Sequence, residues 1–296
     1  LGTIRDDLKN VRPENAPDVV IGEDDWLGDL VSTGTVLPLY PSGATKRQLA
    51  QRALAAFTYG IALKRIYGMP YAIDNVALVV NTELAKVPTT FAQLEREALA
   101  FKRRKSGNLA LAVPQGLAGD AYHTFPFFSG LGGYVFGRNR IGLLDPSNIG
   151  VANKTFIAKS SLIDRWNREG LLDSKVDYNL AKTAFLGKRA AFWITGPTEA
   201  PSLKASGLTF RIVRVPKIKL AARPFLSVYG LMVTKYAVTH GVDALARNFV
   251  SSSMSTSRAQ LDLANADGRM PANVKAAAGY KDPIARAFGK AGVGGV

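Results

Sequence analysis

Short apolar runs alternate along the chain with longer stretches of helical spacing. The runs predict buried strands at residues 18–21, 69–81, 108–113, 190–195 and 210–215. The longer stretches predict helices at residues 24–31, 49–63, 91–99, 125–131, 155–166, 179–185, 242–250 and 258–264. An alternation of strands and helices predicts an α/β architecture.

The apolar run at 69–81 is interrupted once, by Asp74 and Asn75. A charged side chain inside a buried strand is costly unless it faces a cleft or a polar partner. Two interpretations stay open: an ordinary strand with an acid at its exposed rim, or a strand whose acid contacts a ligand.

A basic cluster, Lys102 to Lys105, follows the amphipathic stretch at 91–99. Thr90 is a plausible N-cap of that helix, and cations near its C-terminus oppose the negative end of the helix dipole. The cluster is therefore interpreted as a solvated helix end, with a phosphate-binding patch as the alternative.

Composition narrows the choice of chemistry. The 296 residues contain no cysteine and two histidines, His123 and His240, which excludes disulfides and makes a zinc site or a histidine triad improbable. No apolar run reaches the roughly 18 residues that span a bilayer, and the first residues do not resemble a signal peptide. The net charge of +15 raises nucleic acid or an anionic surface as a partner.

Five landmarks occur in register along the chain. They are Asp18 to Leu37 with its Ser32-Thr33-Gly34, the hinge-like run 67–81, Asn81-Thr82-Glu83-Leu84 followed by Pro88-Thr89-Thr90-Phe91, Gly132 to Phe136, and Ile194-Thr195-Gly196-Pro197. Together they resemble the bacterial extracellular solute-binding proteins of the maltose-binding family, and the resemblance covers nearly the whole chain.

The resemblance implies a two-lobe periplasmic-binding-protein fold of type II, each lobe a mixed sheet flanked by helices. It places the N-terminal lobe at 1–73 and 230–272 and the C-terminal lobe at 77–226 and 276–296. Hinges are expected near 73–76, 226–230 and 272–276. The family pattern also leads us to expect a further strand and helix before Leu1 and further helices beyond Val296.

The function implied is that of a non-catalytic receptor of an ABC sugar importer, which captures maltose, maltodextrin, trehalose or a related oligosaccharide by hinge closure. The expected partners are the sugar and a membrane permease, with no cofactor, no metal and no specific nucleic acid. The protein is expected to be a monomer outside the cytoplasm, either periplasmic or held to the membrane by a lipid.

Eight residues match contact positions of the family. They are Asp25, Trp26, Asp74, Asn75, Asp120, Tyr122, Thr198 and Tyr229. A sugar receptor needs carboxylates and amides for hydroxyl groups and aromatic rings for the C–H faces, in line with the apolar walls and few polar groups of other pockets.

Each position also has a structural interpretation. Asp25 can be a helix N-cap, Trp26 can pack beneath the helix, and Asp120 and Tyr122 can be a turn acid and an interfacial tyrosine. Thr198 stands where the family commonly carries a tryptophan, and the lost ring could cost roughly 1 to 3 kcal/mol of binding. We consider Tyr229 as a replacement surface.

Two other functions stay open at this stage. A glycosidase would place two of these carboxylates about 5 to 9.5 Å apart across a scissile bond. A nucleic-acid-binding protein, suggested by charge alone, would lose affinity steeply as salt is raised.

Overall fold

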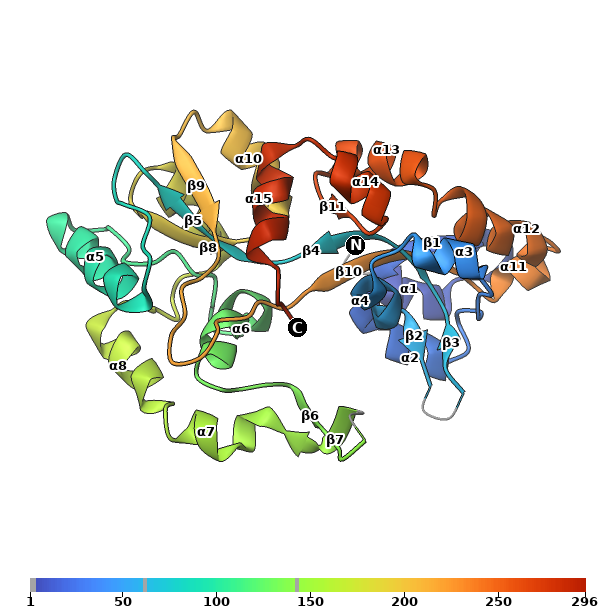
Figure 1. The fold of residues 1–296 in the computed structure, drawn as a ribbon, viewed down its shortest axis with the longest axis horizontal. Helices are drawn as coiled ribbons and strands as arrows, with labels where there is room; N and C mark the ends of the chain where they lie inside the picture. The colour runs from blue at the N-terminus through green and yellow to red at the C-terminus, as the bar shows by residue number, and fades with distance from the viewer. Residues whose placement is uncertain (1–3, 61–62, 142–143) are drawn as a thin grey trace. The chain divides into compact units, whose positions relative to one another are not determined.

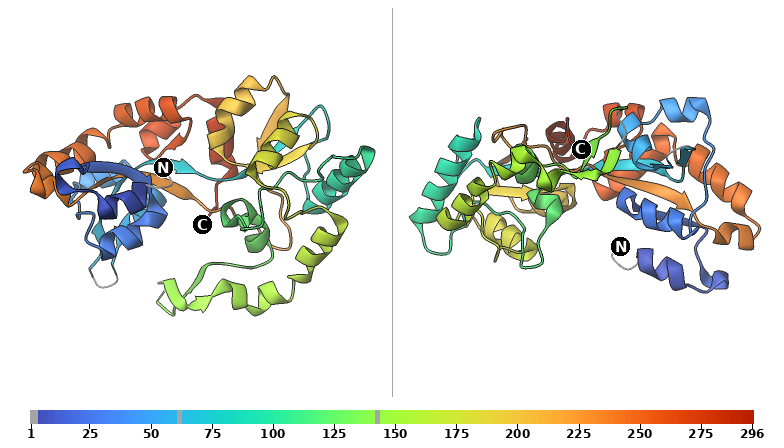
Figure 2. Two further views of the ribbon diagram at one scale, coloured as in Figure 1. Left: turned by 180° about the vertical axis from the view of Figure 1, so that it is seen from behind. Right: turned by 90° about the horizontal axis from the view of Figure 1, so that it is seen from below.

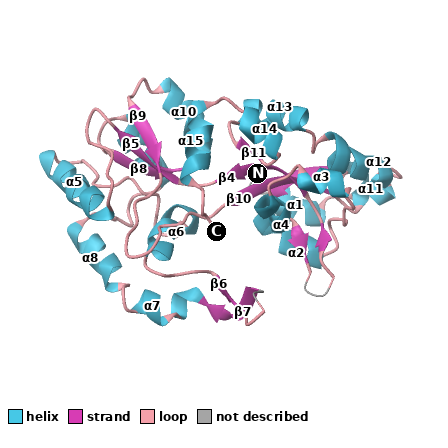
Figure 3. Cartoon of the chain, in the orientation of Figure 1, coloured by secondary structure: helices cyan, strands magenta, loops and turns pink. Residues whose placement is uncertain are grey.

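The computed structural model describes residues 4–60, 63–141 and 144–296 (Figure 1). The chain divides into two compact units: unit 1 consists of Leu1–Asp74 and Ser227–Arg286, and unit 2 of Asn75–Leu226 and Ala287–Val296. Helices and several sheets are interspersed along the chain (Figure 3), so the predicted α/β class is confirmed. The lobes and hinges expected from the sequence stay a prediction.

Unit 1 is built on a four-stranded antiparallel sheet with the strand order β1-β10-β4-β11. These strands are β1 (Val19–Glu23), β10 (Ser227–Val233), β4 (Met69–Asp74) and β11 (Met270–Pro271). Val19 pairs with Val233 across one edge of β10, and Ser227 pairs with Asp74 across the other. The sheet therefore joins segments more than 150 positions apart in the sequence.

Both faces of this sheet are covered. Along β10, Tyr229, Leu231 and Val233 pack into one apolar cluster, while Val228 and Met232 pack into another. Because successive side chains of a strand point to opposite faces, a strand buried on both sides has a nearly continuous apolar sequence.

Helices of one to three turns complete unit 1, together with the ribbon of β2 (Thr58–Tyr59) and β3 (Arg65–Ile66). They are α1 (Ile4–Asn10), α2 (Leu27–Ser32), α3 (Gly43–Arg47), α4 (Gln51–Ala56), α11 (Tyr236–Thr239), α12 (Asp243–Asn248), α13 (Ser257–Asp267), α14 (Val274–Gly279) and the start of α15 (Pro283–Ala291). Short single turns lie at η1 (Pro13–Asn15), η2 (Asp24–Trp26) and η5 (Phe249–Ser253).

One long helix predicted in unit 1 is wrong in its extent. The stretch 49–63 was expected to be helical throughout, but α4 ends at Ala56 because Thr58 pairs with Ile66 in the β2–β3 ribbon. Gly60, at φ 116°, lies outside the helical region. Residues 61–62 of this prediction lie outside the described residues.

Unit 2 has a three-stranded antiparallel sheet with the order β8-β5-β9. Its strands are β5 (Ala77–Asn81), β8 (Phe192–Thr195) and β9 (Phe210–Val213), and a separate hairpin joins β6 (Phe136–Arg138) to β7 (Leu144–Ile149). The strand predicted at 69–81 is therefore two strands, β4 and β5, interrupted at Asn75 and Val76.

The strand predicted at 108–113 is not formed. This segment runs along β8 and shares with it the single parallel bridge between Ala112 and Trp193. All pairings between named strands in the described part of the chain are antiparallel. The sheets were expected to mix parallel and antiparallel pairing, and the bridge between Ala112 and Trp193 is the one parallel contact among the described residues.

The helices of unit 2 are α5 (Phe91–Arg104), α6 (Ala121–Gly130), α7 (Lys154–Ile157), α8 (Ser161–Glu169), α9 (Tyr178–Leu186) and α10 (Ala200–Ala205), with single turns at η3 (Gly150–Ala152) and η4 (Pro197–Glu199). The predicted N-cap of α5 is confirmed, since the Thr90 side chain accepts a hydrogen bond from the Gln93 amide. The single helix predicted at 155–166 is two helices, α7 and α8.

Helices α5 and α8 lie side by side in both views of Figure 2. Phe91 of α5 and Trp166 of α8 hold their ring centroids 5.1 Å apart, and Arg165 forms an ion pair with Glu95. These helices pack onto the core that contains Val76, Leu78 and Val80. None of the helices among residues 4–60, 63–141 and 144–296 is both long and apolar enough to cross a bilayer.

Candidate ligand-binding site

Three consecutive acids, Glu23, Asp24 and Asp25, stand at the end of β1 and the start of η2. Asp24 accepts a hydrogen bond of 2.9 Å from the Val228 amide, which ties η2 to the start of β10. Burial raises the pKa of Asp24 to about 6, and it also raises the pKa of Glu23. Asp25 is exposed and is the N-cap of neither η2 nor α2, so its N-cap interpretation is wrong and its ligand contact stays a prediction.

Trp26 packs in the interior of unit 1. Its side chain is only 7% exposed and belongs to the apolar cluster with Leu27 and Leu30. A Cβ on Gly22 would come within 2.4 Å of the Trp26 ring, so a glycine is needed for this close approach. Of its two interpretations, packing is what the structure describes; a ligand contact by Trp26 stays a prediction.

Asp74 ends β4 in a buried ionic cluster. Its Oδ2 lies 3.3 Å from Nε of Arg269, and Nη1 of the same arginine lies 3.3 Å from Oδ2 of Asp267. The Arg269 guanidinium also stands 4.2 Å from the centre of the Tyr229 ring. Although burial would lower the pKa of Arg269, its anionic and aromatic neighbours raise it, so the arginine stays charged.

Tyr229 and Asn75 are both fixed by hydrogen bonds. The Tyr229 hydroxyl donates to Oε1 of Glu23 over 3.1 Å, and burial raises the pKa of this tyrosine. The Asn75 amide donates to the carbonyl oxygens of Phe288 and Val76 within unit 2. Its amide nitrogen is therefore occupied by backbone partners.

In unit 2, Asp120 caps the N-terminus of α6. Its Oδ1 accepts from the His123 amide over 2.9 Å, and its Oδ2 lies 2.7 Å from Nδ1 of the same histidine. Burial would raise the pKa of Asp120, but the hydrogen bonds from His123 outweigh burial and lower it. Asp120 is thus an oriented carboxylate that is half-buried, and the half-buried ring of Tyr122 meets the imidazole edge-on at 5.3 Å.

A second carboxylate cluster lies next to Thr198. Glu199 is 3% exposed and forms an ion pair of 2.8 Å with Lys182. Its Oε1 also accepts from the Tyr178 hydroxyl, and the Tyr178 ring lies 5.7 Å from His123. Burial would raise the pKa of Glu199, but the bonds from Lys182 and Tyr178 lower it.

Most of the predicted site residues thus lie in or beside one group in each unit, whereas Asn75 joins neither and bonds to the backbone of Val76 and Phe288. In unit 1 the structure brings together Asp74 and Tyr229 around Arg269, and Tyr229 also bonds to Glu23 at the end of β1, three residues before Trp26. In unit 2 the rings of His123 and Tyr178 connect Asp120 to Glu199, beside the exposed Thr198.

Sequence reasoning did not assign to the site seven residues of these groups. They are Glu23, Asp267 and Arg269 in unit 1 and His123, Tyr178, Lys182 and Glu199 in unit 2. A weak signal existed for Glu199, an acid directly after the Gly196-Pro197 turn, but none existed for Arg269, whose partner Asp74 is 195 positions away. Among the described residues, no three histidine, aspartate or glutamate side chains gather as ligands for a metal ion.

Comparison with known proteins identifies the class. A sequence profile of the bacterial extracellular solute-binding proteins matches residues 7–256, and the chain therefore belongs to this family, whose members bind solutes and are not enzymes. The resemblance found in the sequence is confirmed.

Individual relatives are 24% to 29% identical to the chain over the aligned residues. The maltodextrin-binding protein MdxE of Bacillus subtilis is 29% identical over 236 residues, which is 75% of this chain and 53% of that protein. A maltooligosaccharide ABC transporter solute-binding lipoprotein of Streptococcus pneumoniae is 29% identical over 215 residues, or 69% of this chain and 48% of that protein. A galactooligosaccharide-binding protein of Bacillus subtilis is 24% identical over 211 residues, with the same shares. The chain spans about half the length of these relatives.

Proposed function

We propose that this protein is the non-catalytic, sugar-binding component of an ABC importer and that it captures a maltooligosaccharide or a related oligosaccharide. The observation that carries the proposal is the pair of carboxylate groups around Asp74 and Asp120, each oriented by a cationic or imidazole partner and each beside an aromatic ring. In a chain of the solute-binding family, such groups suit the hydroxyls and C–H faces of a sugar.

The finer form of the proposal follows the family. Unit 1 and unit 2 would be the two lobes of a type II periplasmic-binding-protein fold, and they would close on the sugar by a hinge motion. Maltose, maltodextrin and trehalose are the ligands proposed, a membrane permease is the partner that receives them, and the receptor is a monomer. Its location is extracytoplasmic, either periplasmic or lipid-anchored at the outer face of the cell membrane.

Calorimetric titration tests this function. Maltotriose, maltose, trehalose and a galactooligosaccharide are titrated separately, and we expect saturable binding of at least one of them with no release of shorter sugars. Asp120→Asn should weaken this binding about tenfold or more, because hydrogen bonds to a charged acceptor are worth roughly 1.5 to 3 kcal/mol. The substitution retains a good N-cap for α6.

The matched control is Asp177→Asn. Asp177 caps α9 in the same way, with its side chain accepting from the Leu180 amide, and it is not among the predicted ligand residues. Equal affinity in the Asp120 and Asp177 variants would remove Asp120 from the site. Sugar cleavage would support the glycosidase instead, and salt-sensitive DNA binding without sugar binding would support the nucleic-acid alternative.

Thr198→Trp should tighten sugar binding about threefold to tenfold. The threonine is exposed at η4, so a tryptophan fits there without disturbing the core, and an aromatic contact adds about 0.5 to 1.5 kcal/mol. Ser106→Trp, at an exposed position after α5, is the control for simply adding a tryptophan. If both variants bind the sugar like the parent, Thr198 does not border the ligand.

A further inference from the structure

The positive charge of the protein is concentrated in unit 2. Unit 2 contains 23 Lys and Arg against 10 Asp and Glu, a net charge of +13, whereas unit 1 contains 15 against 13, a net charge of +2. Net charge of this size governs which surfaces a protein associates with. Sugar binding does not require it, because the proposed ligands are neutral.

Exposed apolar side chains gather in one part of unit 2. Of the twenty large apolar side chains exposed among the described residues, seven lie between positions 135 and 157. They are Val135, Phe136, Ile141, Leu144, Ile149, Val151 and Ile157. We call residues 135–141 and 144–159 the hairpin–helix surface; it comprises β6, β7, η3 and α7, which follow one another along one margin of unit 2 (Figure 1).

The hairpin–helix surface is basic as well as apolar. Arg138, Arg140, Lys154 and Lys159 lie within it, and Asp145 is its only acidic residue. Phe136 pairs with Ile149 and Arg138 pairs with Leu144 across the β6–β7 hairpin, so cationic and apolar side chains occupy the same small element. Exposed apolar surface of this kind marks a site of interaction.

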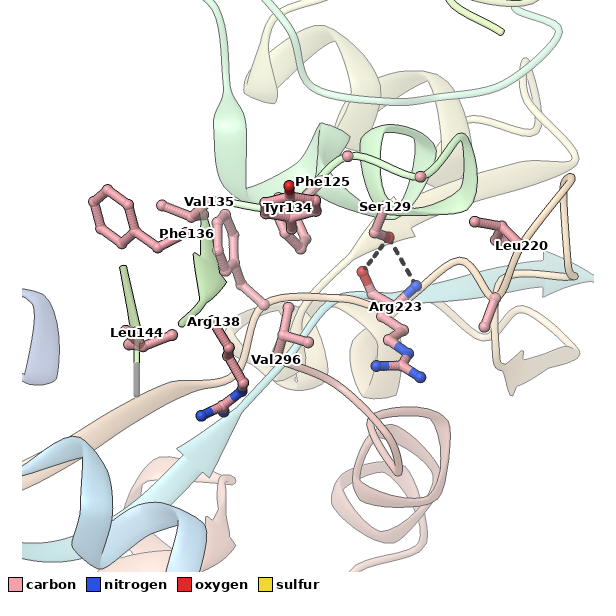
Figure 4. A pocket seen from close by; sticks show the side chains of 14 residues that line it. Phe125, Ser129, Tyr134, Val135, Phe136, Arg138, Leu144, Leu220, Arg223 and Val296 are labelled. Carbon is pink, nitrogen blue, oxygen red and sulfur yellow. Dashed lines mark hydrogen bonds between the residues drawn. The ribbon is translucent and has the colours of Figure 1, made fainter. Parts of the chain in front are cut away.

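A pocket of about 640 Å³ adjoins this surface. The hairpin–helix surface contributes Val135, Phe136 and Leu144 at one end of the pocket, and Leu220 lies at the other end (Figure 4). The remaining lining includes the stacked rings of Phe125 and Phe225, and its charged side chains are Arg138 and Arg223. The pocket therefore extends the apolar area of the hairpin–helix surface, and its charged side chains are positive like most of those on that surface.

We propose that the hairpin–helix surface of unit 2 binds an anionic lipid bilayer. A bilayer meets both features at once: anionic headgroups attract the arginines and lysines, and the acyl region accepts the exposed apolar side chains. A nucleic acid would use the cations but leave the apolar side chains in water. The adsorption would orient unit 2 toward the membrane independently of the sugar.

Vesicle sedimentation tests the proposal with the 296-residue chain. Equimolar phosphatidylglycerol and phosphatidylcholine vesicles at low salt should carry the protein into the pellet, whereas pure phosphatidylcholine vesicles should leave it in the supernatant. Binding should weaken as salt is raised, because salt screens the attraction to the headgroups.

Two sets of substitutions separate the contributions. The triple variant Phe136→Ser, Ile141→Ser and Leu144→Ser should weaken binding to the anionic vesicles about tenfold or more, since it removes apolar area from the contact. Replacing Arg138, Arg140 and Lys154 by glutamine should weaken binding to the anionic vesicles about a hundredfold. Each cation near an anionic surface contributes roughly 1 kcal/mol to binding, and three such contributions add up to this factor.

The matched control for the serine variant lies in unit 1. Val238→Ser, Leu245→Ser and Phe249→Ser remove side chains that are 56%, 69% and 43% exposed, close to the 44%, 79% and 60% of the three hairpin residues. This control should bind vesicles like the parent, and circular dichroism should show the same fold for all variants.

Three results would overturn the proposal. The first is a parent protein that does not sediment with anionic vesicles. The second is a serine variant that sediments like the parent. The third is a parent dimer that the serine substitutions convert to a monomer, which would assign the surface to a second copy of the chain. The sugar titration is unaffected by these outcomes, because the hairpin–helix surface contains none of the predicted sugar contacts.

Discussion

Arg269→Met is expected to lower the free energy of unfolding by about 3 to 5 kcal/mol, the cost of breaking a buried ion pair by removing one partner. The Arg269 side chain is 14% exposed, and that of its partner Asp74 is 5% exposed. Methionine keeps much of the apolar stem but leaves Asp74 and Asp267 without their shared cation. Chemical denaturation at neutral pH measures the loss.

Arg258→Met is the matched control for this substitution. Arg258 pairs with Asp262 at a distance similar to that of the buried pair, but the two side chains are 87% and 61% exposed. Exposed pairs of this kind contribute about 0 to 1 kcal/mol. Equal stability of the two variants would show that the Arg269 cluster is hydrated and does not contribute to the free energy of unfolding.

A double variant distinguishes the ion pair from simple packing. If Asp74 and Arg269 are coupled, adding Asp74→Asn to Arg269→Met should restore part of the lost stability, because the buried negative charge that has lost its arginine is removed as well. Additive losses would mean that the two side chains act independently. The same cycle measured by sugar titration tests whether Asp74 also contacts a ligand.

Local patterns predicted local structure well. The N-cap Thr90 and the amphipathic stretch after it were sufficient to place α5, because a cap and its helix are encoded within one turn. The apolar run at 190–195 likewise became β8, which is buried throughout. Such features depend on neighbours in the sequence, which the chain itself displays.

Predictions failed where a distant partner decides the outcome. The run at 108–113 has the composition of a strand, but the single bridge at Ala112 shows that a ladder also requires a paired neighbour. The Ala-rich stretch 49–63 is divided by the pairing of Thr58 with Ile66, which overrides helix propensity.

The candidate site shows the same division. Residue types suitable for a sugar could be chosen from the sequence, but their partners could not. The Arg269 that holds Asp74 and the Gly22 that admits the Trp26 ring are recognised only from the packed structure. A resemblance to a family supplies the positions, whereas the physical constraint on each position comes from its three-dimensional neighbours.

Asp24→Asn is expected to stabilise the protein at pH 7 to 8 by about 1 to 2 kcal/mol. Burial raises the pKa of Asp24 from 3.8 to about 6, so the folded state holds its proton more tightly than the unfolded state does. This contribution to stability is fully present below pH 3.8 and is lost as pH rises through about 6. Asparagine has no charge to bury, and its side-chain oxygen still accepts from the Val228 amide.

The magnitude follows from the size of the shift. One pKa unit corresponds to 1.36 kcal/mol, which gives a ceiling of about 3 kcal/mol for Asp24, and partial hydration of the side chain reduces it. Unfolding midpoints of the parent and the variant should therefore coincide below pH 3.8 and separate progressively as pH rises to about 7. The measurement is urea denaturation at several pH values.

Asp25→Asn is the control, because Asp25 is exposed and adjoins the same turn. If both variants change stability equally at all pH values, the effect is one of net charge and not of the buried carboxylate. A gain confined to Asp24→Asn would mean that the native protein keeps a destabilising acid between β1 and β10. Natural proteins commonly retain such costs where function requires them, so the same variant should then be tested in the sugar titration.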